Sequence, residues 1–135
     1  MGRLILGIVA GIVVAFATVL AVDFAGHQIY PLPAGLDLDD PQAVGAFIAA
    51  MPAAARMLVL AAFFAGALGG GVAAAAVSRR EWAAWPVAGL VVAAGAAKLL
   101  MVPHPVLLRA LTLAAPLLGG VAASLVARRM ARNGR

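Results

Sequence analysis

The residues of this chain that could do chemistry are few, and the first pair along the sequence is Asp23 and His27. They stand four residues apart, so both side chains lie on one face if this segment is helical. A carboxylate beside an imidazole is a common arrangement in proton relays. Lys98 and His104 follow in a similar order further along the chain. These four residues form the polar cluster that we predict as the candidate site.

Lys98 is the residue that we expect to neutralise Asp23. Both lie near the end of an apolar run, at places that correspond in the first and third runs. An ion pair would remove much of the cost of a charge inside a bilayer, which is at least ~2–3 kcal/mol near the centre. The alternatives are a Lys98 side chain that extends to the outer interface and an Asp23 carboxylate that already lies in water.

Metal binding is a second hypothesis for the same residues. Asp23, His27 and His104 are ligand types for zinc or copper, and residues 37–40 offer further carboxylates. Their spacing matches no compact ligand motif, so interfacial histidines that form hydrogen bonds are the favoured interpretation. We therefore predict no resident metal and no cofactor.

Enzymatic activity has little support in the sequence. The chain contains no phosphate-binding loop, no dinucleotide fingerprint and no GxSxG motif, and it has no cysteine. Ser78 and Ser124 have no adjacent base, and we expect Thr18 and Thr112 to bond to their own helices. We expect no catalytic residue and no enzyme.

Four apolar runs position these residues. They cover residues 4–23, 53–78, 82–102 and 106–128, each close to the ~20 residues that a helix needs to cross a ~30 Å hydrocarbon core. With 65% hydrophobic and 11% charged residues, a water-soluble domain is excluded. The sequence predicts one all-α domain over residues 1–135, an up-down transmembrane four-helix bundle.

The basic residues set the expected orientation. The net charge is +5, and seven basic residues fall on one side of a four-span chain: Arg3, Arg79, Arg80, Arg128, Arg129, Arg132 and Arg135. By the positive-inside rule this side is cytoplasmic, with both termini. We expect contact with anionic lipid there and no nucleic-acid partner.

The long outer loop, residues 24–52, is expected to contain a short amphipathic helix. Asp40 and Pro41 are an N-cap and a first-turn proline, and an apolar face follows at helical spacing. Its members are Val44, Phe47, Ile48 and Met51. We predict that this helix lies on the outer membrane surface or across the mouth of the bundle.

Small residues mark the expected contact faces of the spans. Close backbone approach has to hold helices together in lipid, because the lipid tails are as apolar as the side chains. Pairs spaced by four are Gly7 and Gly11, Gly66 and Gly70, and Ala115 and Gly119. We expect these faces to pack within the chain, and some of them to serve a partner.

A repeat is also visible. Residues 70–80 and 119–129 are identical at eight of eleven positions, including paired glycines and paired arginines. Two helical hairpins in the same orientation, related by a twofold axis along the membrane normal, would explain this match.

Short motifs follow one another along most of the chain. They are Asp23, Gly26-His27, Tyr30-Pro31, Asp40-Pro41, Pro52, Gly69-Gly70-Gly71 and Pro103-His104-Pro105. This order resembles that of a group of small bacterial four-span inner-membrane proteins of uncharacterised function, in which asparagine often stands where this chain has Lys98. The resemblance implies the four-span fold and a bacterial inner membrane, and no chemistry.

The functional expectation is an accessory or scaffold protein that packs into a homo-oligomer or a larger membrane complex. The alternative is a small transporter or an ion- or proton-conducting protein that uses the polar cluster, although that cluster lies at the outer end and not at the midplane. Outer-face metal binding is the third hypothesis.

Overall fold

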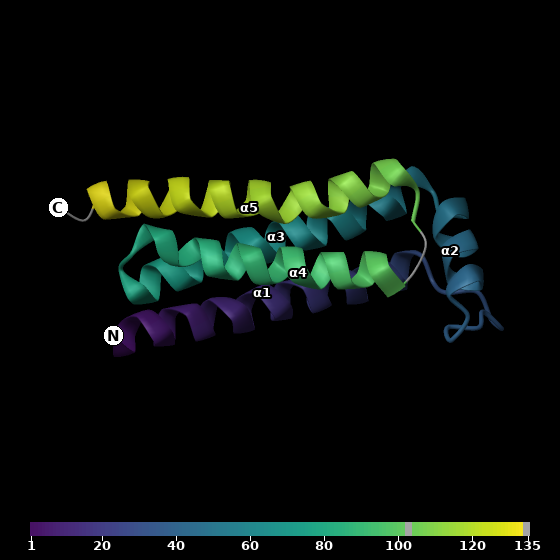
Figure 1. The fold of residues 1–135 in the computed structure, drawn as a ribbon, viewed down its shortest axis with the longest axis horizontal. Coiled ribbons are helices and arrows are strands. Elements are labelled where there is room, and N and C mark those ends of the chain that lie inside the picture. Colours follow the sequence, from purple (N-terminus) through teal and green to yellow (C-terminus); the bar gives the residue numbers. More distant parts are fainter. Residues whose placement is uncertain (102–103, 134–135) are drawn as a thin grey trace.

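The computed structural model describes residues 1–101 and 104–133. Its long helices are α1 (Gly2–Ile29), α3 (Ala53–Ser78), α4 (Ala84–Met101) and α5 (Val106–Asn133), with a short α2 (Pro41–Ala50) and a 3-10 turn η1 (Glu81–Ala83). The long helices run up and down, and both termini lie at one end (Figure 1). Val102 and Pro103 of the predicted outer turn, and Arg135 of the basic tail, lie outside the described residues.

Four helical segments in the described part of the chain are long and apolar enough to cross a membrane. The protein is therefore a multi-pass integral membrane protein, and the predicted all-α four-helix bundle is confirmed. The longest helices have 28 residues, or ~42 Å of helix, so their ends extend beyond a ~30 Å hydrocarbon core. Polar residues near those ends therefore sit close to the membrane interfaces.

The first helix is longer than the apolar run that predicted it. We expected the outer loop to begin at residue 24, but α1 continues to Ile29. Its last turns contain no proline before Pro31, and the N–H of Tyr30 still donates to the carbonyl of Gly26. Asp23 and His27 therefore lie on regular helix, and not on a loop.

The core consists mainly of alanine. Ala62, Ala67, Ala74 and Ala88 are fully buried, and Phe63 is the large side chain among them. Large apolar side chains face outward instead, most clearly along α1. This distribution suits lipid, where small residues allow helices to approach and large ones face the acyl chains.

Glycines make the crossing of α1 and α3. A Cβ on Gly11 would lie 2.5 Å from the carbonyl oxygen of Gly70, and a Cβ on Gly70 would lie 2.5 Å from that of Gly11. Gly7 meets the carbonyl of Ala74 in the same way, and Gly66 lies against α1 near Ala15. The first two predicted small-residue pairs are thus used against each other inside the chain.

The third pair packs α5 onto α3. A Cβ on Gly119 would lie 2.5 Å from the carbonyl oxygen of Phe64. Ala115 packs against the alanine core one turn earlier, and Pro116 between them is fully buried. These small-residue faces are therefore covered within one chain, and α3 occupies the centre of the bundle.

The repeated segments do not occupy equivalent environments. Gly70 and Gly119 align in the repeat, yet Gly70 faces α1 of its own hairpin while Gly119 faces α3 of the other hairpin. The second glycines of the repeat show the reverse pattern: Gly71 faces α5 of the other hairpin, while Gly120 faces α4 of its own hairpin. These contacts are therefore not related by a strict twofold axis. The duplication of the hairpin stays a prediction.

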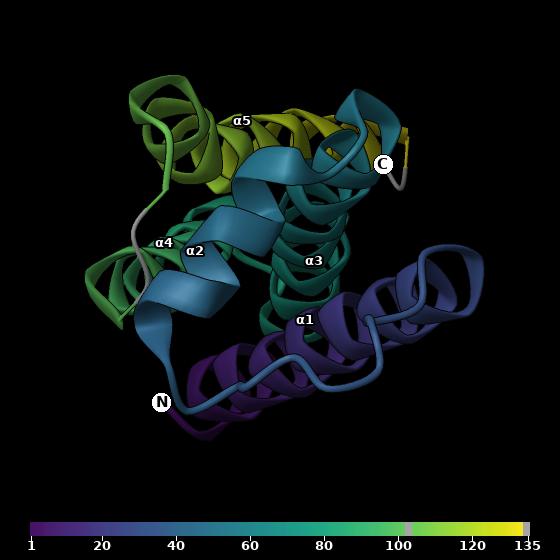
Figure 2. The same cartoon turned by 90° about the vertical axis from the view of Figure 1, so that its right-hand side faces the viewer.

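The predicted short helix is confirmed as α2. The carboxylate of Asp40 accepts a hydrogen bond of 2.9 Å from the N–H of Gln42, and Pro41 occupies the first turn. Figure 2 shows α2 lying across one end of the bundle. It therefore covers the mouth of the bundle.

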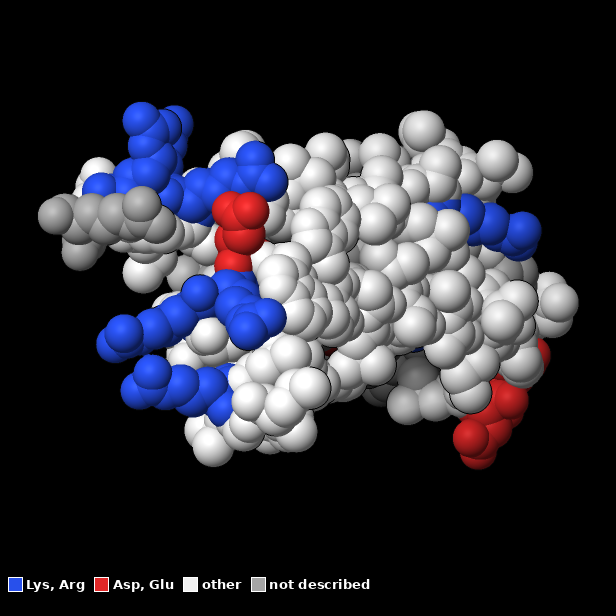
Figure 3. Space-filling view, turned by 60° about the vertical axis from the view of Figure 1, so that its left-hand side comes forward, with Lys and Arg blue, Asp and Glu red and all other residues white. Residues whose placement is uncertain are grey.

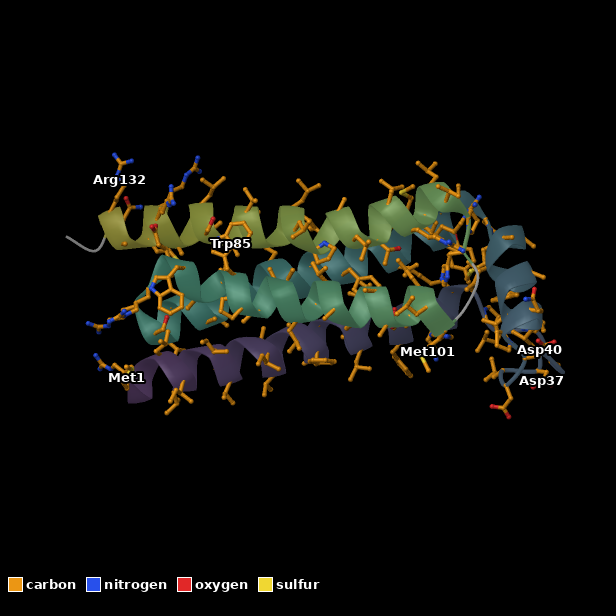
Figure 4. The ribbon with its side chains drawn as sticks, viewed as in Figure 1. Met1, Asp37, Asp40, Trp85, Met101 and Arg132 are labelled. Carbon is orange, nitrogen blue, oxygen red and sulfur yellow. The ribbon has the colours of Figure 1, made fainter. Side chains whose placement is uncertain are left out.

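Charge divides the molecule into two ends. Figure 3 shows most of the visible basic side chains gathered at one end, around an acidic side chain, then an uncharged belt, and at the other end acidic side chains with a smaller basic patch. Met1 and Arg132 mark the basic end, and Asp37 and Asp40 mark the end covered by α2 (Figure 4). We refer to these as the basic end and the α2 end.

Candidate binding site at the α2 end

A cavity of about 280 Å³ opens at the α2 end, among all four long helices and under α2. Most of its wall is apolar, and α2 contributes Val44, Phe47 and Ile48, the face predicted from the sequence. The polar residues on the wall are Asp23, His27, Arg56, Lys98, His104 and Thr112. The structure therefore brings the whole predicted polar cluster to one cavity.

Asp23 and Lys98 meet inside this arrangement. The carboxylate of Asp23 on α1 lies 3.8 Å from Nζ of Lys98 on α4, which is an ion contact longer than a hydrogen bond. The side chain of Asp23 is 27% exposed and that of Lys98 is 59% exposed. Nζ also lies 5.7 Å from the ring centre of Phe63, within cation–π range. Lys98 thus reaches Asp23 and Phe63, while more than half of its side chain stays exposed.

His27 does not form the carboxylate–imidazole relay that its spacing allows. Its Nδ1 lies 2.7 Å from the backbone carbonyl of Asp23, and a carbonyl only accepts, so Nδ1 carries the proton. Within the described residues, no hydrogen bond or ion pair joins the imidazole to the Asp23 carboxylate. The His27 ring lies at the cavity wall, beside Asp23.

Arg56 is the cavity residue that the sequence reasoning missed. It lies in the first turn of α3, partly buried, and its backbone N–H donates to the carbonyl of Pro52. Its guanidinium makes no hydrogen bond or ion pair with any other described residue. The first turn of α3 contains no acidic residue, so this cation sits at the positive end of a helix macrodipole.

The cavity wall is therefore positive. One carboxylate, that of Asp23, faces two basic side chains, those of Lys98 and Arg56. Lys98 balances Asp23 at 3.8 Å, which leaves the charge of Arg56 without a compensating group on the wall. The signal in the sequence was an arginine four residues after Pro52, at the end of the spans that has few basic residues, the others being Lys98 and Arg109.

His104 enters the cavity from the connection between α4 and α5. Its backbone carbonyl accepts a hydrogen bond of 2.9 Å from Nε of Arg109, in the first turns of α5. Arg109 is exposed and is not part of the cavity wall. It therefore stiffens the connection and offers a matched arginine for comparison with Arg56.

Comparisons with models of known protein families, with curated proteins and with solved structures found no match to this chain. The fold and the cavity therefore carry the functional argument.

The metal hypothesis gains no support from the geometry. Among the described residues, no three His, Asp or Glu side chains converge as ligands, although three of them line this cavity. In the loop, Asp37 accepts a hydrogen bond of 3.0 Å from the N–H of Asp39, and Asp40 caps α2. Two of the predicted loop carboxylates thus stabilise local backbone.

A pathway through the bundle gains no support either. At the basic end a groove lies between the ends of α3 and α5, and it shares no wall residue with the cavity at the α2 end. Between them Ala67, Ala74 and Val87 are fully buried, and the α1–α3 crossing is closed by glycine contacts. A transporter would be favoured by a cavity that opens to both sides of the bundle. The cavity described here opens at the α2 end.

Proposed function

We propose that this multi-pass membrane protein is a non-enzymatic binding protein of the bacterial inner membrane, and that it holds a small anionic amphiphile in the cavity at the α2 end. The observation that carries the proposal is Arg56, a partly buried guanidinium without an acceptor in an apolar cavity. Both termini are cytoplasmic in this proposal, so the cavity opens to the outer face.

The charge of Arg56 favours an anionic head group. A cation held in apolar surroundings is costly unless a partner neutralises it, and no described residue does so. A carboxylate or phosphate would accept two parallel hydrogen bonds from the guanidinium. The free N–H groups at the start of α3 favour negative charge at the same place.

The walls favour an apolar tail. Apolar side chains of α2, α3 and α5 line the cavity, among them Phe47, Phe63 and Leu108. The volume of about 280 Å³ is just below the ~300–1,000 Å³ range of small-molecule sites. A single short chain, or one end of a longer lipid, fits this size.

The test is binding of decanoate, with decanol as the uncharged match. The full chain is purified into nanodiscs of phosphatidylcholine, and the thermal midpoint is followed by tryptophan fluorescence. We expect decanoate to raise the midpoint of the wild type and of Arg109→Gln, and to leave Arg56→Gln unchanged. Decanol should act weakly on all three proteins. An equal rise in Arg56→Gln would refute the proposal.

An accessory role in a homo-oligomer or a larger complex is the second candidate. Since the predicted glycine faces are covered within the chain, the surface that favours this role is the outward face of α1, with Leu6, Val13 and Leu20 exposed. Mild-detergent purification from native membranes followed by mass spectrometry tests it. A partner in fixed ratio supports the role, and a monomer of this chain alone speaks against it.

A further inference from the structure

The basic end carries a second concave site, independent of the cavity under α2. A groove of about 840 Å³ lies between the ends of α3 and α5 and beside η1. Its floor is apolar, and Arg79, Arg80 and Trp82 lie at its rim. We propose that this groove binds an anionic phospholipid of the surrounding leaflet, with the phosphate at the two arginines and an acyl chain along the floor.

The groove exists because two closely packed helices end differently. Farther from the basic end α3 and α5 touch, since a Cβ on Gly71 would lie 2.7 Å from the Cβ of Ala123. Towards the basic end α3 stops at Ser78, whereas α5 continues to Asn133. The facing side chains there are small, among them Ala75 and Ala127, so the space between the helices stays open.

The charges on the groove favour an anion. Its carboxylate, Glu81, is already engaged, because Oε2 lies 2.8 Å from Nε of Arg128 on α5. Arg79 and Arg80 also line the groove, and neither side chain makes a hydrogen bond or ion pair with another described residue. With Glu81 and Arg128 balanced, two positive charges remain at the rim.

The backbone holds Arg79 in a conformation that favours glycine. Arg79 ends α3 with φ 56° and ψ 31°, the left-handed conformation, in which a side chain is sterically disfavoured. Glycine is the usual residue at this position of a helix end, because it has no Cβ. A long cationic side chain at such a position supports a role for that side chain in binding.

The neighbouring residues fix this corner. The hydroxyl oxygen of Ser78 accepts a hydrogen bond of 3.2 Å from the N–H of Arg80. Arg80 is extended and leads directly into η1, where Trp82 stands half exposed. Tryptophan is the residue that favours the head-group level of a membrane. In this proposal the two arginines, next to Trp82, lie at the level of the lipid phosphates.

A phospholipid fits these features better than a free phosphate. An inorganic anion would use the arginines and leave the apolar floor between Ala75 and Ala127 exposed to water. Basic pockets between spanning helices at the cytoplasmic side are typical sites for anionic lipid head groups. One lipid supplies both the charge and the chain.

The test compares phosphatidylcholine nanodiscs with and without phosphatidylglycerol, using the full chain. Bound phosphatidylglycerol is counted by native mass spectrometry across a lipid titration. We expect Arg79→Gly and Arg80→Gln each to weaken binding about fivefold. Arg132→Gln lies on the same end but outside the groove, and it should bind like the wild type.

Arg79→Gly also separates a binding role from a structural role. Because glycine relieves the left-handed conformation, the variant should be at least as heat-stable as the wild type in pure phosphatidylcholine, while losing the stabilisation that phosphatidylglycerol gives. If Arg79→Gly does not fold, Arg80→Gln alone decides. Unchanged binding in both variants, equal loss in Arg132→Gln, or an equal effect of inorganic phosphate would each overturn the proposal.

Discussion

The carboxylate of Asp23 on α1 lies 3.8 Å from Nζ of Lys98 on α4, and these helices share the least contact of the neighbouring pairs in the bundle. Glycines hold α1 against backbone carbonyls of α3, whereas the glycine contact from α1 to α4 among the described residues is with a side chain, because a Cβ on Gly11 would lie 2.9 Å from Cγ2 of Val87. The ion contact is therefore placed where the backbone packing is weakest. It closes the bundle at the α2 end, beside the cavity.

The first prediction concerns the strength of this contact. Asp23→Asn and Lys98→Met should each destabilise the fold, and the double variant should lose less than the sum of the two. Because the Lys98 side chain is 59% exposed, the expected coupling is only about 0.5–1 kcal/mol. Unfolding in mixed micelles of mild and denaturing detergent measures it. Additive effects would show that the contact contributes nothing to stability.

The second prediction concerns the α1–α3 crossing. A Cβ at Gly70 would lie 2.5 Å from the carbonyl of Gly11 and 2.6 Å from the Cβ of Ala15. Because a backbone oxygen cannot move aside cheaply, Gly70→Ala should cost about 1–3 kcal/mol or more. Gly89→Ala is the matched control, since nothing lies within 4 Å of its Cβ position, and it should be neutral or stabilising. Equal effects of the two substitutions would contradict the crossing.

Some of this architecture follows from local sequence. Asp40 and Pro41 predict the start of α2 because an N-cap and a first-turn proline act through their immediate neighbours. Thr18 and Thr112 bond to the carbonyls of Val14 and Leu108, four residues back, as apolar surroundings require. The small residues at spacing four likewise mark helix faces that can approach closely.

Other features depend on tertiary arrangement and escape the sequence. The charge of Arg56 becomes notable only because α2 crosses the end of the bundle and closes a cavity over it. Likewise, the alignment of Gly70 with Gly119 gives no sign that they face different partners, since a helix rotation decides this. The extension of α1 to Ile29 was missed because hydropathy marks the lipid-crossing part of a helix, and not the helix itself.

The third prediction concerns the cap of α2. Asp40→Ala removes the acceptor for the N–H of Gln42 and should destabilise α2 by about 1 kcal/mol. The backbone amides of α2 should then exchange faster with solvent in Asp40→Ala. Because α2 covers the cavity, decanoate should also bind more weakly. Asp37→Ala makes the same change in charge but removes only a loop hydrogen bond to Asp39. Hydrogen exchange that rises equally in both variants would argue against a cap-dependent lid.

The fourth prediction concerns orientation, and the absence of cysteine makes it clean to measure. Gln42→Cys, exposed on α2, should react with a membrane-impermeant maleimide in intact spheroplasts. Asn133→Cys, exposed at the basic end, should react only after lysis, because positive charge favours the cytoplasmic side. Gly89→Cys, exposed in the middle of α4, should stay unlabelled in both conditions.

The two cysteine positions also bear on the two proposed sites. Labelling of Asn133→Cys in intact spheroplasts would place the basic end outside, against the positive-inside rule. The groove with Arg79 and Arg80 would then face the outer leaflet, and the cavity with Arg56 would draw its ligand from the cytoplasmic side. With the expected labelling pattern, the Arg56 cavity instead opens to the outer face of the membrane and takes its ligand from that side. The arginine groove then binds lipid of the inner leaflet.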